Sequence, residues 1–216
     1  MPRYSLLDAA RDYMRVGMAR QLTPDHANLY LGEKGQRLEH VAPHLFSCDP
    51  GGMIEHMTLA GLEPDEAGIL VESEATFPEV FKHFRRFLTA IRGRDGAKVL
   101  FRFYDPRVLR AFLPVCTREE LDRFFGPINV FLCQGDEPGV VLTFRRTPSG
   151  GLDVSEAPFD EVFERRYGVR PSTVAPFSAP PPVEPPLSPA LQRHRQLVIQ
   201  GFLRGPVQPR TPREPA

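Results

Sequence analysis

The sequence has no surplus of charge of either sign, because 27 lysine and arginine residues stand against 27 acidic residues in a chain of 216. Proteins that bind nucleic acid or anionic membranes by general electrostatics need an excess of lysine and arginine. No stretch approaches the roughly 18 consecutive apolar residues of a membrane helix. The N-terminus reaches Asp8 too soon to contain the apolar core of a signal peptide. We therefore expect a cytoplasmic protein with no nucleic-acid partner and no membrane span.

Cysteine and the common catalytic motifs are also scarce. Cys48, Cys116 and Cys133 form no CxxC pair and leave one thiol unpaired in any disulfide scheme, so we expect reduced, buried thiols. The chain has no GxSxG, no Walker loop and no GxGxxG after a strand. His40 and His44 flank a proline in a strand-like stretch, which does not give the helical spacing of a zinc pair. We predict no metal, no cofactor and no catalytic residue.

Proline is abundant but unevenly placed, since 12 of the 24 prolines lie from Pro171 onward. We predict an α/β domain, a short extension, a Pro-rich linker and a tail, over residues 1–146, 147–170, 171–187 and 188–216. The linker composition favours extended polyproline II over helix. The tail contains a candidate helix with Leu191, Val198 and Phe202 on one side. This helix either docks on a partner or folds back on its own domain, and the sequence leaves both possibilities open.

The spacing of apolar residues predicts alternating strands and helices. Short apolar or alternating runs predict strands at Tyr4–Leu7, Leu38–Phe46, Ala67–Val71, Lys98–Tyr104, Ile128–Leu132 and Val140–Phe144. Apolar residues three and four apart predict a helix from Phe77 to Ile91, and shorter helix candidates lie between Asp8 and Thr23 and from Met53 to Leu62. Asp105-Pro106 is a helix start, and Thr117 and Glu120 form a capping box that opens another helix.

This alternation predicts an α/β fold. We expect a mixed β-sheet flanked by helices, with right-handed crossovers between parallel strands. The small helical segment of the tail follows the Pro-rich linker.

Arginines gather in the predicted helix, strand and helix between residues 85 and 110, namely Arg85, Arg86, Arg102, Arg107 and Arg110. In one interpretation they form a pocket that clamps a phosphate or carboxylate, with Asp105 as a base. The other interpretation is structural, since a strand arginine such as Arg102 needs a buried acid, either Asp105 or Asp8. A helix-capping Asp105 accepts hydrogen bonds that lower its pKa, which suits proton abstraction poorly. The structural interpretation is favoured.

Four segments together resemble a known bacterial family. They are YSLLDAAR (Tyr4–Arg11), HFRRFLTAI (His83–Ile91), FRFYDPRVLRAFLP (Phe101–Pro114) and FFGPI (Phe124–Ile128). The family is domain of unknown function 4123, the effector adaptors or chaperones of type VI secretion systems. The resemblance implies a non-enzymatic, cytoplasmic protein that binds the N-terminal part of a secreted effector and helps load it onto the VgrG spike. It also implies an α/β lobe followed by a smaller C-terminal lobe, which the short Pro-rich end of this chain does not match.

An adaptor needs a binding surface, and two regions of the sequence are candidates. One is basic and combines Lys82, Arg85 and Arg86 on the polar side of the predicted 77–91 helix with Arg107. The other is the apolar side of the tail helix, made by Leu191, Val198 and Phe202, which a flexible linker would let dock in a groove of a partner. We interpret Arg102, Tyr104, Asp105 and Pro106 as a structural motif. The alternative function is a small enzyme or binding protein for an anionic substrate.

Overall fold

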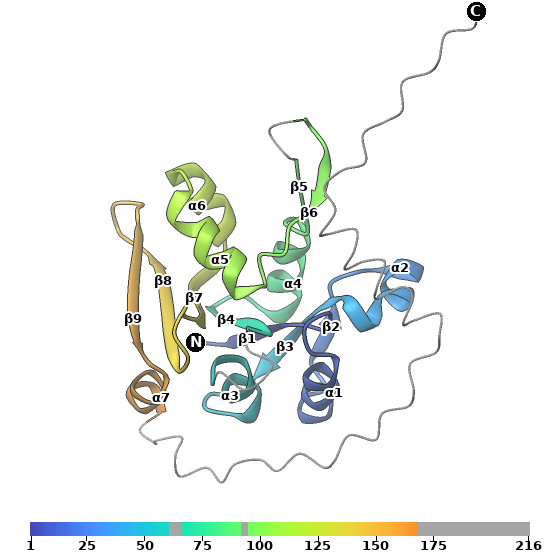
Figure 1. Cartoon of the computed structure of the whole chain (residues 1–216), viewed down its shortest axis with the longest axis horizontal. Helices are drawn as coiled ribbons and strands as arrows, with labels where there is room; N and C mark the ends of the chain where they lie inside the picture. The colour runs from blue at the N-terminus through green and yellow to red at the C-terminus, as the bar shows by residue number, and fades with distance from the viewer. Residues whose placement is uncertain (61–65, 92–94, 168–216) are drawn as a thin grey trace, which may run out of the picture. The chain divides into compact units, whose positions relative to one another are not determined.

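The computed structural model describes residues 1–60, 66–91 and 95–167 (Figure 1). Within these residues, seven strands form one sheet in the order β2-β3-β1-β4-β7-β8-β9. These strands are β1 (Arg3–Asp8), β2 (His26–Asn28), β3 (Pro43–Cys48), β4 (Gly68–Ser73), β7 (Ile128–Gln134), β8 (Val140–Arg146) and β9 (Leu152–Pro158). A separate hairpin pairs β5 (Thr89–Ile91) with β6 (Lys98–Leu100).

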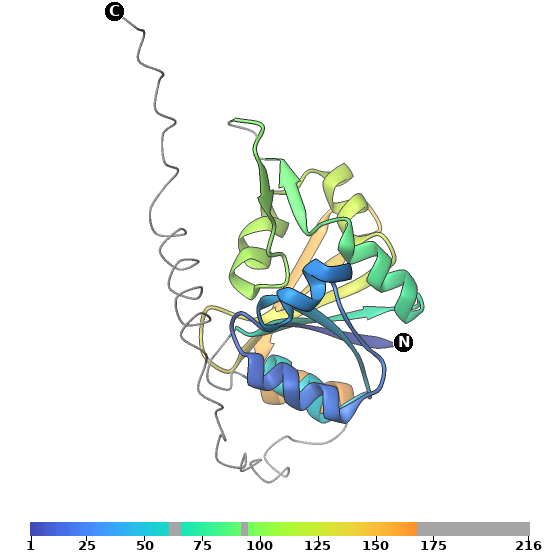
Figure 2. The ribbon, with the colours of Figure 1, turned by 90° about the vertical axis from the view of Figure 1, so that its right-hand side faces the viewer.

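Helices connect the strands and lie on both faces of the sheet. They are α1 (Tyr13–Leu22), α2 (Gly32–Arg37), α3 (Met53–Leu59), α4 (Phe77–Arg85), α5 (Pro106–Phe112), α6 (Arg118–Phe125) and α7 (Phe159–Tyr167), with short 3-10 helices η1 (Glu39–Val41) and η2 (Leu113–Val115). Figures 1 and 2 show α4, α5 and α6 above the sheet and α1, α3 and α7 below it. The predicted α/β fold, a sheet flanked by helices, is confirmed.

The sheet differs from the expected one in its strand directions. Every described pair of neighbouring strands is antiparallel. The prediction that the sheet mixes parallel and antiparallel neighbours is therefore wrong. The crossover through α3 does join two parallel strands, β3 and β4. However, β1 lies between them and pairs antiparallel with both. A helical crossover therefore need not produce neighbouring parallel strands when an earlier strand already occupies the central position.

Alternation along the strands divides the apolar residues between two cores. In β1, Leu6 faces the upper core with α4, α5 and α6, whereas Leu7 faces the lower core with α1, α3 and α7. The upper core is aromatic. Phe84 stacks on Phe103 with ring centroids 5.3 Å apart, and Phe124 stacks on Phe131 at 5.2 Å. Aromatic pairs in such offset or edge geometry add to the stabilisation by burial.

Two helix starts form as the sequence predicts. The Asp105 side chain accepts a hydrogen bond from the Arg107 amide, and Pro106 occupies the first turn of α5. Thr117 and Glu120 exchange the two hydrogen bonds of a capping box at the start of α6. These signals are local, because each needs only a side chain and a backbone group two or three residues away.

Three predicted elements have different boundaries in the structure. The helix predicted over 77–91 ends at Arg85, and residues 89–91 form β5 instead. The strand predicted over 98–104 ends at Leu100, and the one predicted over 38–46 starts only at Pro43, after η1. The apolar periodicity runs past Arg85 because Phe87 and Leu88 pack on the upper core from the turn that follows the helix.

Residues 147–167 complete the fold, although the sequence suggested only a short extension there. β9 pairs with β8 along its whole length, and α7 buries Phe159, Val162 and Phe163 in the lower core. The His56 ring contacts the rings of Phe159 and Phe163 at 5.3 and 6.0 Å. The Pro-rich linker and the tail predicted from residue 171 onward lie outside the described residues.

Candidate functional site

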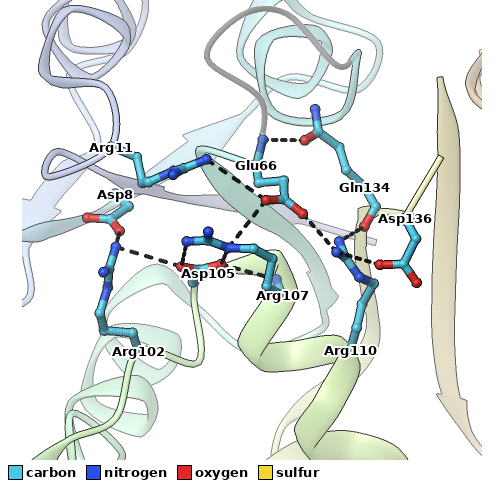
Figure 3. Close-up of polar contacts among 9 residues, drawn as sticks. All are labelled: Asp8, Arg11, Glu66, Arg102, Asp105, Arg107, Arg110, Gln134 and Asp136. Carbon is cyan, nitrogen blue, oxygen red and sulfur yellow. Dashed lines mark hydrogen bonds and ion pairs between the residues drawn. The ribbon is translucent and has the colours of Figure 1, made fainter. Parts of the chain in front are cut away.

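Ionic side chains from four separate parts of the chain meet at one end of the central strands (Figure 3). We call this group the arginine network. Its members are Asp8 at the end of β1, Arg11, Glu66 before β4, Arg102 and Asp105 before α5, Arg107 and Arg110 on α5, Gln134 at the end of β7, and Asp136. The network contains three of the five arginines that the sequence groups together.

The pair between Arg102 and Asp8 is the most buried part of the network. The Asp8 side chain has 0% exposure, that of Arg102 has 25%, and the guanidinium donates a hydrogen bond to the carboxylate. Arg102 also lies 3.8 Å from the carboxylate of Asp105, so it contacts both of the acids that the sequence offers. Burial raises the pKa of Asp8, and the charge and hydrogen bond of Arg102 oppose this shift.

Asp105 is held by Arg107 through two parallel hydrogen bonds. The Arg107 Nε and Nη2 atoms lie 3.0 and 2.7 Å from the two carboxylate oxygens, and the Arg107 amide adds a third contact at 3.1 Å. Burial favours the neutral acid, but these hydrogen bonds and the charges of Arg107 and Arg102 outweigh it, so the pKa of Asp105 is lowered. A carboxylate with this environment is a poor general base at neutral pH.

Glu66 joins the helix α5 to the start of the central strand β4. Its carboxylate lies 2.7 Å from Arg110, 3.3 Å from Arg107 and 3.9 Å from Arg11. Its backbone has a φ of 61°, which is unfavourable for a residue with a side chain. The Glu66 amide donates to the Gln134 side chain, and its ion pairs hold the residue in this conformation. Glu66 therefore connects the arginines of α5 and the end of β7 to the start of β4.

Arg110 completes the connection to β7. Its guanidinium donates to the carbonyl oxygen of Gln134 at 2.7 Å and lies 2.8 Å from the carboxylate of Asp136. The Arg110 side chain is only 12% exposed, whereas that of Asp136 is 87% exposed. The network thus runs from a buried pair at Asp8 to an exposed acid at Asp136.

The charges of the network balance. Its nine residues include four arginines and four carboxylates, and the three clustered arginines each contact at least one acid. Arg85 does not join them, because its Nε donates to the carbonyl of Leu29 at 3.3 Å and its guanidinium lies over the Phe81 ring. Arg86 is exposed at the end of α4. The five arginines therefore do not converge, and the arrangement is that of a structural ion network.

Tyr104 and Pro106 flank the network from the interior. Tyr104 is 1% exposed, and its hydroxyl shares a hydrogen bond with that of Tyr30. Burial and then the charge of Asp8 raise the pKa of Tyr104, so its phenol stays protonated. Pro106 is buried in the first turn of α5. With Arg102 and Asp105, these residues fix the start of the helix against the sheet.

The predicted partner-binding residues of the domain are all accessible. Lys82 and Arg85 are exposed on α4, Arg86 is exposed directly after its last residue, and the Arg107 side chain is 48% exposed although it pairs with Asp105. Arg107 lies in the arginine network, and the three α4 residues lie outside it. Leu191, Val198 and Phe202 of the predicted tail helix lie outside the described residues.

The histidines and cysteines have structural environments. His44 is buried, its Nε2 lies 3.1 Å from the carbonyl oxygen of Glu39, and burial lowers its pKa to about 4. Burial raises the pKa of Cys133 to about 12, and Cys48 and Cys133 are buried free thiols as expected, whereas the free thiol of Cys116 is only partly buried. In the described part of the chain, no three potential ligands come close enough together to hold a metal ion. None of the helices described there has the length and apolar run needed to cross a bilayer.

Sequence reasoning missed Glu66, Arg11, Gln134 and Asp136. The contact between Glu66 and Arg110 joins residues 44 positions apart, and no local pattern links them. One signal was present in the sequence. Arg107 and Arg110 are three residues apart and share a helix face, so one acid from another segment can contact both.

Comparison with known families agrees with this structure. The profile of the family named Domain of unknown function (DUF4123) matches residues 3–123, which is more than half of the chain. The protein belongs to this family, which is associated with the effector adaptors of type VI secretion systems. The match includes β1, α4, α5 and most of the arginine network, and it ends before β7. No curated protein and no solved structure gave a match.

Proposed function

We propose that this protein is an adaptor that binds a type VI secretion effector and helps load it onto the VgrG spike. The observation that carries the proposal is the family match over residues 3–123. The match includes β1, β3 and β4 with α1, α3, α4 and α5, which contribute to the cores on both faces of the sheet, so it concerns a folded framework and not a short motif. An adaptor acts on its effector before secretion, and we propose that it does so in the cytoplasm.

We further propose that the protein acts by binding and not by catalysis. Its most conspicuous polar cluster, the arginine network, has its charges satisfied internally, which supports a structural role. Asp105 was the best candidate for a base, and the lowered pKa of its carboxyl does not suit that role. These features count against the alternative of an enzyme that clamps an anionic substrate with Arg102 and Arg107.

The basic face of α4 is one proposed contact surface for the effector. Lys82, Arg85 and Arg86 are exposed on a helix whose opposite face is fixed in the aromatic core by Val80 and Phe84. A rigid helix that presents several cations attracts an acidic surface and steers its approach. Arg107 is the weaker candidate, because its charge is already paired. Leu191, Val198 and Phe202 of the tail are the proposed apolar contacts.

Co-purification tests the proposal. The tagged full chain is expressed together with the product of the large open reading frame adjacent to its own gene, and a stable complex of about micromolar affinity or better is expected. Deletion of residues 171–216 separates the tail from the folded domain as the binding element. A well-expressed partner that never co-purifies with the full chain would contradict the adaptor function.

A further inference from the structure

The strand β9 leaves one edge of the sheet open. It pairs with β8 through all seven of its residues, and no other strand of the described chain pairs with its outer side (Figure 1). The opposite edge is the three-residue β2, which offers far less backbone. An open edge strand presents a row of unpaired amides and carbonyls to which another extended chain can add.

The hydrogen-bond pattern identifies which backbone groups point outward. The Thr147 amide donates to the carbonyl of Gly151 at 3.0 Å at one end of the hairpin, and the Phe159 amide donates to Gly139 at 2.7 Å at the other. Hydrogen-bonded and non-hydrogen-bonded pairs alternate along an antiparallel ladder. Counting from either end of the hairpin, residues 153, 155 and 157 belong to hydrogen-bonded pairs, so their amides and carbonyls face β8. The amides and carbonyls of Val154 and Glu156 therefore point away from β8.

The side chains of β9 leave this edge accessible. Val154 has 46% of its surface exposed, and Asp153, Ser155 and Glu156 are exposed as well. Natural edge strands are commonly protected by charged side chains, especially lysine, or by proline, and the charges on β9 are the two acids Asp153 and Glu156. The sequence of β9, LDVSEAP, has no lysine, and its one proline is the last residue.

A hollow adjoins the same strand. Its volume is about 450 Å³, and its lining includes Ser155–Pro158 of β9 with Thr143 and Arg145 of β8. A strand added beside β9 would point every second side chain toward this face of the sheet. The hollow extends inward over β8 to Arg3 of β1 and Glu72 of β4, so only a long side chain that reached across β9 would enter it, and the open backbone edge itself remains the feature to which a strand can add.

Charge identifies the kind of strand that fits. Asp153 and Glu156 on β9 are followed by Asp160 and Glu161 at the start of α7, and all four are exposed acids. A second copy of the chain pairing through β9 would bring like charges together, which is unfavourable between neighbouring strands. A basic extended segment of another protein would instead place opposite charges across the pair.

We propose that β9 is the docking edge for an extended, basic segment of the effector, which adds to the sheet as an eighth strand. The inference rests on the proposed adaptor function and adds to it the conformation and charge of the bound segment. Backbone hydrogen bonds with Val154 and Glu156 supply affinity, and the acids on β9 select the sequence.

The test removes one outward amide and leaves the β8–β9 ladder intact. Val154→Pro deletes a donor that faces away from β8, a position where an edge strand tolerates proline. Val154→Thr is the matched control, since it keeps the amide and nearly the same volume. Each full-length variant is compared with wild type in thermal unfolding, in binding to the adjacent open reading frame's product, and in binding to peptides selected from a random display library on the wild-type chain.

We expect wild type and Val154→Thr to bind alike, and Val154→Pro to lose about tenfold or more in affinity for both probes. The selected peptides should be basic with alternating apolar residues. Glu156→Lys should weaken binding by a similar factor, whereas Glu33→Lys on α2 should not. Peptides or effector that bind a folded Val154→Pro variant as tightly as wild type would overturn strand addition. If the effector does not bind wild type at all while basic peptides still add to β9, the adaptor function fails and the docking edge stands.

Discussion

Replacement of Arg102 by alanine tests whether the arginine network stabilises the fold. The guanidinium of Arg102 contacts Asp8, whose side chain is fully buried, and no lysine or second arginine is paired with Asp8 in the described structure. The substitution therefore leaves a buried carboxylate that still accepts a hydrogen bond from the Ala10 amide at 3.0 Å. A buried charge without its counter-ion is among the strongest destabilising features known in proteins.

The magnitude follows from the burial of the pair. Removal of one partner of a buried ion pair costs about 3–5 kcal/mol. The Arg102 side chain keeps 25% exposure and Asp8 keeps its amide contact, so we expect a loss of about 2–4 kcal/mol at neutral pH. For a domain of this size, that loss corresponds to a fall in Tm of roughly 5–15 °C.

The loss should depend on pH with a definite sign. Burial already raises the pKa of Asp8 above its ordinary value of 3.8, and loss of Arg102 raises it further. A carboxyl with a raised folded pKa contributes stability at low pH, and this contribution disappears as the pH rises through that pKa. The gap between wild type and Arg102→Ala should therefore be largest at neutral pH and should narrow as the pH falls toward 4.

Urea unfolding at several pH values, followed by circular dichroism, measures this gap. Asp8→Asn in the Arg102→Ala background is the control, because it removes the charge that the single variant leaves unpaired and should recover part of the loss. A loss below about 0.5 kcal/mol, or a gap that stays constant with pH, would refute the structural role of the pair. A folded, fully stable Arg102→Ala protein that lost binding of a small anion would favour the alternative function.

Other predictions concern the core and the helix ends. Phe124→Ala should cost about 3–5 kcal/mol in urea unfolding, because its ring lies among five other phenylalanines of the upper core, whereas Arg123→Ala at an exposed position should cost little. Gly126→Ala should destabilise the fold by at least about 2 kcal/mol, since Gly126 has a φ of 50° and an added methyl group would clash with the His83 ring. A loss no larger than that of a surface substitution would contradict this prediction. Thr117→Ala should lower the Tm by a few degrees through the loss of about 1 kcal/mol of capping. Thr117→Ser keeps the capping hydroxyl, so its Tm should stay close to that of wild type.

The parts of the fold that were predicted correctly are those with local signals. The caps at Asp105 and Thr117 depend on side chains and amides a few residues apart, so the sequence carries them in full. β9 was not predicted, because its sequence contains no such local signal. An edge strand exposed on both faces has few buried positions, and LDVSEAP therefore lacks the apolar alternation by which strands are recognised.

The site was predictable only in part. A strand-like arginine among apolar residues requires an acid, and this reasoning led from Arg102 to Asp8 and Asp105. It could not lead to Glu66, because the choice among many acids depends on how the chain returns to the start of β4. The same reasoning could not exclude Arg85 from the network. In the structure α4 ends at Arg85, and the Arg85 side chain donates to the carbonyl of Leu29 instead of joining the other arginines.

The family match ends at residue 123, but the folded unit continues. β7 lies between β4 and β8, and Phe131 of β7 stacks on Phe124, so a fragment ending at residue 123 would leave β4 with an open edge and the aromatic core incomplete. β9 thus lies outside the residues that the family profile matches, whereas α4 lies within them. β9 nevertheless belongs to the same sheet on which α4 packs. The two proposed docking surfaces can therefore be separated. Exchange of residues 147–167 between two family members that load different effectors should transfer partner choice if β9 selects the partner, whereas exchange of α4 should do so if its basic face makes the selection.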